Sequence, residues 1–180
     1  MSFLDRIVAA VTPLESAEDR AAARHNARQA AEPGDWLSLV LDHHEQIEAA
    51  FEKARSTDDP AGRLAAQKEL MIILTGHSNA EESVLYPAMA DSGEKGSAGL
   101  AFEEQAMAKV QMALLEKLDP ASQEWLDKLE HIRGAVTHHI YQEESHWLLE
   151  LKRDAPAADQ ARLTARYAEE IARYEGAELV

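Results

Sequence analysis

The segment His77-Ser78-Asn79-Ala80-Glu81-Glu82-Ser83 recurs in similar form 62 positions later as His139-Ile140-Tyr141-Gln142-Glu143-Glu144-Ser145. Both segments lie in stretches whose apolar residues recur at the spacing of an α-helix. Residues four apart lie on one face of an α-helix, because 3.6 residues complete a turn. His77 therefore points the same way as Glu81, and His139 points the same way as Glu143. The spacing predicts two imidazole–carboxylate pairs on two helices.

The two pairs lie in the middle of apolar helix faces, which predicts that they are buried. His77 shares its face with Leu70 and Val84, and His139 shares its face with Val136. Burying an imidazole and an ionised carboxylate without a partner costs several kcal/mol. A cation supplies the missing counter-charge, and mixed nitrogen and oxygen ligation suits iron or manganese. We therefore predict a metal centre inside a helical bundle.

The bulk composition limits the classes of function. Cysteine is absent, which excludes disulfides, iron–sulfur clusters and cysteine-ligated zinc. The net charge of -15 argues against binding nucleic acid or an anionic membrane, because phosphate contacts need clustered Lys and Arg. The apolar run at 7–11 is too short for a signal-peptide core, and no stretch reaches the roughly 18 apolar residues of a membrane span. We expect a cytoplasmic protein.

Turn-forming residues at 33–35, 57–60, 91–96 and 119–120 divide the chain into helical segments. Short connections between long helices make neighbours antiparallel, which predicts an all-α fold, an up-down-up-down four-helix bundle. The predicted bundle helices span about 36–56, 61–90, 98–118 and 122–153. The predicted parts are a helical N-terminal arm at 1–34, the bundle at 35–153, and a C-terminal helix packed on the bundle at 154–180.

The two halves of the bundle resemble an internal duplication. A shift of 61 or 62 residues places the first bundle helix on the third and the second on the fourth. The second and fourth helices of an up-down bundle are parallel and diagonal to each other. The two imidazole–carboxylate pairs are therefore expected to face each other across the bundle axis with approximate two-fold symmetry.

Helical phasing separates neighbouring polar residues into ligand candidates and others. His44 lies at the centre of an apolar stripe, whereas His43 is rotated by about 100° toward a mixed edge. We predict His44 as a ligand, and His43 behind the ligands or at the rim. His138 is expected outside the ligand set. Glu82 and Glu144 lie about 140° from their histidines and are expected in solvent or behind the ligands.

The third bundle helix breaks the symmetry. The position equivalent to His44 is Gln105, an amide where symmetry asks for an imidazole. Glu104 lies near the centre of that helix's apolar stripe, and His146, one turn beyond Glu143, is another replacement. The sequence leaves open whether Gln105, Glu104 or His146 supplies the ligand expected from the predicted helix at 98–118. The predicted metal ligands are His44, His77, Glu81, Glu104, His139 and Glu143.

Four motifs carry a resemblance to a known family, and they lie at 42–51, 77–87, 103–120 and 138–144. Together they resemble the hemerythrin-like (HHE cation-binding) family over about residues 36–152. The resemblance implies a non-haem di-iron centre with two bridging carboxylates, held by His44, His77, Glu81, His139 and Glu143. The sequence departs from the family pattern at Gln105, where a histidine is expected, and after Glu144, where the usual proline is absent.

The resemblance implies a protein with two non-haem iron ions, with manganese or zinc as alternatives. The expected reactants are O2, NO or peroxide, in stress protection, sensing or iron handling, and any enzyme activity would be that of a di-iron oxidase or peroxidase. The alternative is a metal-stabilised structural or partner-binding bundle without turnover. The N-terminal arm is expected to serve packing, a homodimer or a protein partner, and no nucleic-acid or membrane partner is expected.

Overall fold

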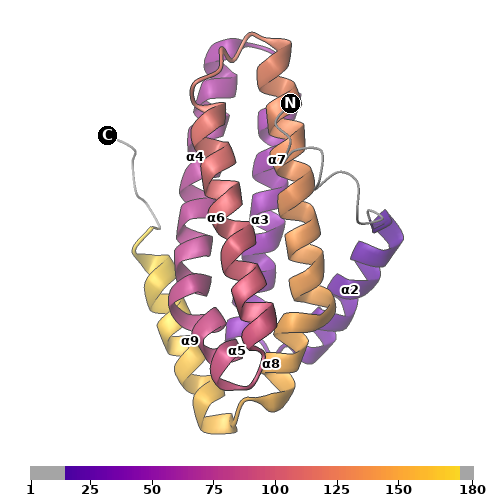
Figure 1. Cartoon of the computed structure of the whole chain (residues 1–180), viewed down its shortest axis with the longest axis vertical. Coiled ribbons are helices and arrows are strands. Elements are labelled where there is room, and N and C mark those ends of the chain that lie inside the picture. The colour runs from indigo at the N-terminus through magenta and orange to yellow at the C-terminus, as the bar shows by residue number, and fades with distance from the viewer. Residues whose placement is uncertain (1–14, 175–180) are drawn as a thin grey trace.

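The structure is a computed structural model that describes residues 15–174. Within that range all regular secondary structure is helical. Four long helices run side by side along the molecule, and two shorter helices lie on its flanks near one end (Figure 1). This arrangement confirms the predicted all-α fold, an up-down-up-down four-helix bundle with additional N-terminal and C-terminal helices. The amphipathic stretch predicted at 2–12 lies outside the described residues.

The bundle is built from α3, from α4 continued by η1 and α5, from α6, and from α7 continued by η2 and α8. The α-helices are α2 (Ala17–Ala30), α3 (Trp36–Ser56), α4 (Pro60–Ala80), α5 (Tyr86–Asp91), α6 (Lys95–Leu115), α7 (Gln123–Gln142), α8 (Leu148–Asp154) and α9 (Ala157–Ala172). The two π-helical turns are η1 (Glu81–Leu85) and η2 (Glu143–Trp147).

Polar side chains fix where the bundle helices begin. Asp35 accepts a hydrogen bond from the backbone N–H of Ser38 at the start of α3, and Asp59 accepts one from Gly62 at the start of α4. Ser122 caps α7 in the same way. Such caps typically contribute about 1 kcal/mol each. These caps lie where turn-forming residues interrupt the helical periodicity of the sequence.

Each copy of the internal repeat contains one π-helical turn, and each turn begins at a buried glutamate. The backbone N–H of Tyr86 donates to the carbonyl of Glu81, and the N–H of Leu148 donates to the carbonyl of Glu143. A π turn inserts one extra residue into an α-helix and is frequent at functional sites. The residue five positions after each glutamate is therefore brought back toward the face that carries the glutamate.

The apolar interior consists of two clusters with a polar layer between them. One cluster surrounds Trp36 and Leu148, and the other surrounds Phe51 and Trp125. Along α3 the first cluster reaches Leu41 and the second begins at Ile47. The buried polar residues between the clusters are His44, His77, Glu81, Gln105, His139, Glu143 and Glu144.

The flanking helices are tied to the bundle by specific polar contacts. From α9, Thr164 accepts from the backbone N–H of Trp36 at 3.0 Å and Gln160 accepts from its indole N–H at 2.6 Å. From α2, Arg24 reaches into the bundle and contacts Glu144 and Glu48. The two flanking helices therefore pack against the end of the bundle next to the polar layer.

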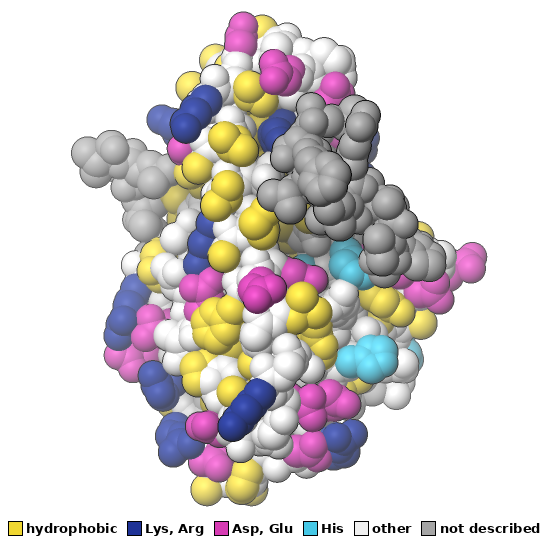
Figure 2. Space-filling model, viewed as in Figure 1, with side chains coloured by type: hydrophobic (Ala, Val, Ile, Leu, Met, Phe, Trp, Pro, Cys, Tyr) yellow, Lys and Arg dark blue, Asp and Glu magenta, His cyan; other side chains and the backbone are white. Residues whose placement is uncertain are grey.

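The outward face of α6 carries large apolar side chains. Figure 2, viewed as Figure 1, shows hydrophobic side chains gathered along the middle of this face of the molecule. The exposed members on α6 are Leu100, Phe102, Met107, Val110 and Leu114. None of the helices between residues 15 and 174 is both long and apolar enough to cross a membrane.

Candidate metal centre

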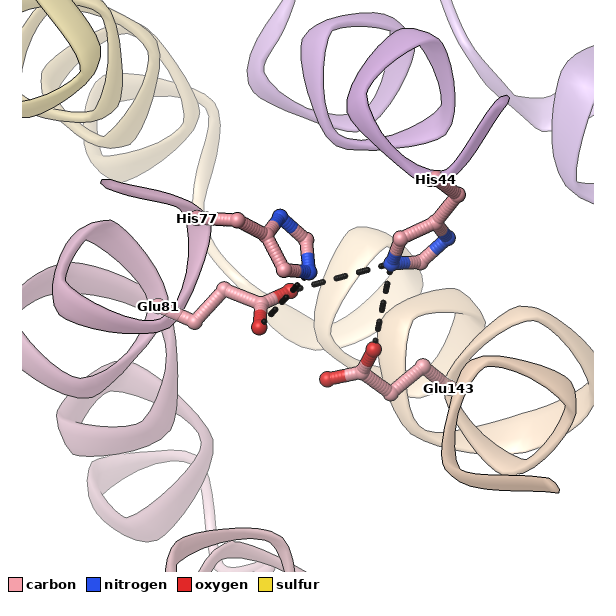
Figure 3. Close-up of side chains that lie close together, drawn as sticks. All are labelled: His44, His77, Glu81 and Glu143. Carbon is pink, nitrogen blue, oxygen red and sulfur yellow. Dashed lines mark ion pairs between the residues drawn. The ribbon is translucent and has the colours of Figure 1, made fainter. Parts of the chain in front are cut away.

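Four buried side chains converge in the polar layer of the bundle. Each offers one nitrogen or oxygen atom, and these atoms all lie within 4.8 Å of one another. The residues are His44 on α3, His77 on α4, Glu81 in η1 and Glu143 in η2. Figure 3 shows the four side chains pointing toward one another, with His77 and Glu81 on one helix and His44 and Glu143 on two others. This half of the layer has two imidazoles and two carboxylates, which is a donor set that transition metals accept.

The atoms at the centre of this group suit a cation better than they suit one another. His44 Nε2 lies 3.2 Å from Glu143 Oε2, and His77 Nε2 lies 3.1 Å from Glu81 Oε2. Neither ring nitrogen is aligned for a hydrogen bond. Two carboxylate oxygens, Glu81 Oε1 and Glu143 Oε2, also have no hydrogen-bond partner in the described chain. Buried polar atoms are nearly always satisfied in folded proteins. The residues therefore fit a bound metal ion.

The other half of the layer is centred on a tyrosine. The Tyr86 hydroxyl lies 2.9 Å from Glu143 Oε1, 3.1 Å from Glu81 Oε2 and 3.1 Å from His139 Nε2. The Gln105 amide donates to the same hydroxyl and to Glu81 Oε2. Glu143 thus presents one oxygen to each half, since its Oε2 faces His44 and its Oε1 faces His139.

The charges in the layer oppose one another when no cation is bound. Burial and the negative charge of Glu143 raise the pKa of Glu81 to about 8. Burial and the nearby His44 hold the pKa of His77 well below its ordinary value. Burial alone would lower the pKa of His44, but Glu143 and Glu144 outweigh it and raise that pKa to about 9. A metal ion favours ionised carboxylates and neutral imidazoles, and so removes this conflict.

The ring nitrogens that face away from the centre are held by hydrogen bonds. His44 Nδ1 lies 2.8 Å from Glu144 Oε1, and His139 Nδ1 lies 2.8 Å from Glu104 Oε2. His77 Nδ1 lies 3.3 Å from the hydroxyl of Tyr167 on α9. A carboxylate or hydroxyl on the outer nitrogen fixes the orientation of a metal-binding imidazole and raises its basicity. All three histidines have such a partner.

Comparison with known proteins agrees with this geometry. A sequence model described as the hemerythrin HHE cation binding domain matches residues 35–151, which contain α3 to η2 and most of α8. The chain belongs to the hemerythrin HHE cation-binding family. A DNA nickase of Nostoc sp. (strain PCC 7120) is 26% identical over 102 residues, which are 57% of this chain and 29% of the nickase. The matched part of this chain thus spans less than a third of that relative's length. No solved structure matches this chain significantly.

The hemerythrin-like centre brings together most of the residues predicted from the sequence. His44, His77, Glu81 and Glu143 share one half of the layer, and His139 borders the other half. His43 lies behind them, with its Nδ1 3.1 Å from the Tyr167 hydroxyl.

The third bundle helix presents an amide to the hemerythrin-like centre. Gln105 is buried, whereas Glu104 lies behind His139 on its outer nitrogen instead of beside the other predicted ligand atoms. The physical reason is that α6 turns Gln105, not its neighbour, toward the interior. His146 is exposed and contacts Ser145, so it is not one of the buried residues of the layer.

The sequence interpretation missed one residue outside the hemerythrin bundle proper. Arg24 on α2 contacts both oxygens of Glu144, at 2.8 Å from Oε1, and also pairs with Glu48 at 2.7 Å. Glu144 is buried and holds the outer nitrogen of His44. The N-terminal arm is therefore connected through one carboxylate to His44, a candidate metal ligand.

Replacing Arg24 with glutamine is expected to weaken metal binding by about tenfold. The reason is that Glu144 then loses the Arg24 guanidinium group, which holds its carboxylate against His44. A competition titration of the metal-free protein with a chromophoric chelator measures the change. Arg28→Gln is the matched control, since Arg28 lies on the same helix and pairs with the exposed Asp42 and Glu45. Equal affinities of the Arg24 variant and the unaltered protein would show that the contact does not act on the centre.

Proposed function

We propose that this protein is a non-haem di-iron protein that reacts with O2, NO or peroxide in stress protection, sensing or iron handling. The observation that carries the proposal is the placement of Glu143 between two imidazoles. Its Oε2 lies 3.2 Å from His44 Nε2, and its Oε1 lies 3.4 Å from His139 Nε2. A carboxylate with one oxygen toward each side is suited to bridging two cations.

The chain's own residues would hold, shield and charge-balance such a centre. His44 and His77 would hold one ion and His139 the other, with Glu81 and Glu143 shared between them. Bound iron would supply one-electron redox chemistry. Every one of these side chains is at most 9% exposed, so we infer that the reactants are small, such as diatomic molecules or peroxide. The carboxylates favour the ferric state, which supports oxidation or sensing over reversible oxygen carriage.

A second candidate is a metal-stabilised bundle without turnover. The amide of Gln105 lies in the half of the layer that would hold the second ion, where symmetry asks for an imidazole, and this favours the second candidate. DNA cleavage, the activity named for the Nostoc relative, is not proposed. The matched residues make up only 29% of that protein, and a net charge of -15 repels DNA. The proposed setting remains the cytoplasm.

Anaerobic loading with ferrous ion followed by rapid mixing tests the proposal. We expect about two iron ions per chain and a near-ultraviolet absorption that develops after mixing with O2, NO or peroxide. Protein loaded with zinc is the control, because zinc has no redox chemistry. If iron-loaded protein gives no optical change with any of the three reactants, and zinc raises thermal stability as much as iron does, the bundle without turnover is the correct function.

A further inference from the structure

The second half of the polar layer lacks one ligand that the internal repeat would supply. His77 corresponds to His139 and Glu81 corresponds to Glu143, but the counterpart of His44 is Gln105. An amide is a weaker ligand than an imidazole for a transition metal. A side chain from another element, α5, lies beside Gln105 in this half of the layer.

Tyr86 reaches the layer because of the π turn before it. Its backbone N–H closes the turn onto Glu81, which brings its side chain toward the same face. The equivalent residue in the second repeat is Leu148, which belongs to the same apolar cluster as the Tyr86 ring but carries no polar atom. Tyr86 is fully buried, and its hydroxyl lies among Glu81, Glu143 and His139.

The distances around the hydroxyl match those between ligands of one ion. Bonds of about 2.0–2.2 Å at angles of about 90–110° place two ligand atoms roughly 2.8–3.6 Å apart. The Tyr86 oxygen is 2.9 Å from Glu143 Oε1, and 3.1 Å from both Glu81 Oε2 and His139 Nε2. His139 Nε2 is 3.4 Å from Glu143 Oε1. All four separations fall within the expected range.

The Tyr86 hydroxyl cannot donate to all of its neighbours at once. A phenol has a single proton to donate, so it can serve only one of the two carboxylates beside it. Glu81 Oε2 also has the Gln105 amide, which donates to both Glu81 and Tyr86. Two carboxylate oxygens and the phenol oxygen therefore lie around one point, and oxygen atoms grouped in this way are stabilised by a cation.

We propose that Tyr86 is a metal ligand, which binds the second ion of the centre through its phenol oxygen together with His139, Glu81 and Glu143. The inference rests on the proposed metal centre. As the oxygen–metal bond forms, the phenol proton leaves to solvent. Tyr86 thereby replaces the imidazole that the third bundle helix lacks, and adds a negative charge on that side of the centre.

The test uses the full chain loaded with iron and then oxidised. Phenolate bound to ferric iron gives a visible charge-transfer absorption that imidazole and carboxylate ligands do not give. We expect this absorption in the unaltered protein and in Tyr174→Phe, and its complete loss in Tyr86→Phe. Tyr174 is the control, because its hydroxyl contacts the amide of Asn79, which lies outside the polar layer.

A second measurement separates this inference from the iron chemistry. Zinc, which is colourless, is added to metal-free protein, and the ultraviolet difference spectrum records ionisation of one tyrosine, again lost in Tyr86→Phe. Iron binding without visible absorption, or absorption that persists in Tyr86→Phe, overturns the inference while leaving the proposed function intact. Iron-loaded protein that is inert to oxidants but ionises Tyr86 with zinc overturns only the proposed function. A chain that binds neither ion overturns both.

Discussion

Replacing Glu143 with alanine is expected to lower metal affinity by roughly 100-fold or more, since loss of even an outer partner of a ligand costs 10–100-fold. Glu143 contacts His44 and His139, one with each of its oxygens. Its loss also leaves these imidazoles without their counter-charge in the metal-free protein. Removing one partner from a buried ion pair typically costs about 3–5 kcal/mol. Metal analysis after purification and urea unfolding of the metal-free form measure the two effects.

Glu82→Ala is the matched control for Glu143→Ala. Glu82 lies next to Glu81 in sequence, but its carboxylate points outward and pairs with Lys109 at 2.6 Å, with 25% of the side chain exposed. Surface ion pairs contribute at most about 1 kcal/mol. The Glu82 variant should therefore retain its metal content. A similar loss of metal in the two variants would contradict the placement of Glu143 in the centre.

Adding metal to the metal-free protein is expected to raise its stability strongly, because the ion binds the folded chain and not the unfolded one. At a free metal concentration about 1,000 times Kd, the free energy of unfolding rises by about 4 kcal/mol. For a chain of this size, that increase corresponds to roughly 8–16 °C in melting temperature. Calorimetry with and without ferrous or zinc ion measures it.

The same titration with His77→Ala shows whether the gain comes from the buried centre. His77 Nε2 has no hydrogen-bond partner within the described chain and its Nδ1 contacts the Tyr167 hydroxyl, so its loss removes a ligand and one hydrogen bond. The variant should keep its helical content and lose most of the metal-dependent increase. An unchanged increase would mean that the ion binds elsewhere, for example on the acidic surface.

The fold could be predicted almost completely from the sequence, because long helices with short connections leave few arrangements. Proline and aspartate at 33–35 and 57–60 marked the ends that the caps confirm. The two π turns were not predicted. A single inserted residue shifts the apolar periodicity only after Glu81 and Glu143, and the stretch that follows is too short to reveal the change.

The candidate site was predictable where ligands share a helix face and not where they come from elsewhere. His77 and Glu81 lie four residues apart, so helix geometry alone pairs them. Tyr86 lies five residues after Glu81, which on a straight α-helix places it about 140° away. Only the π turn brings it back. Arg24 lies 120 residues before its partner Glu144, and no local pattern connects them.

The polar layer across the bundle has a consequence for how the protein opens. Two apolar clusters on either side of a charged layer can behave as separate cooperative units, whose amides exchange hydrogen with solvent at different rates. The ligands come from α3 and α4 and from the two π turns, so one bound ion links helices that contribute to both units. Metal loading would then merge two local openings into one, and the protection of the slowest amides in both units would become equal.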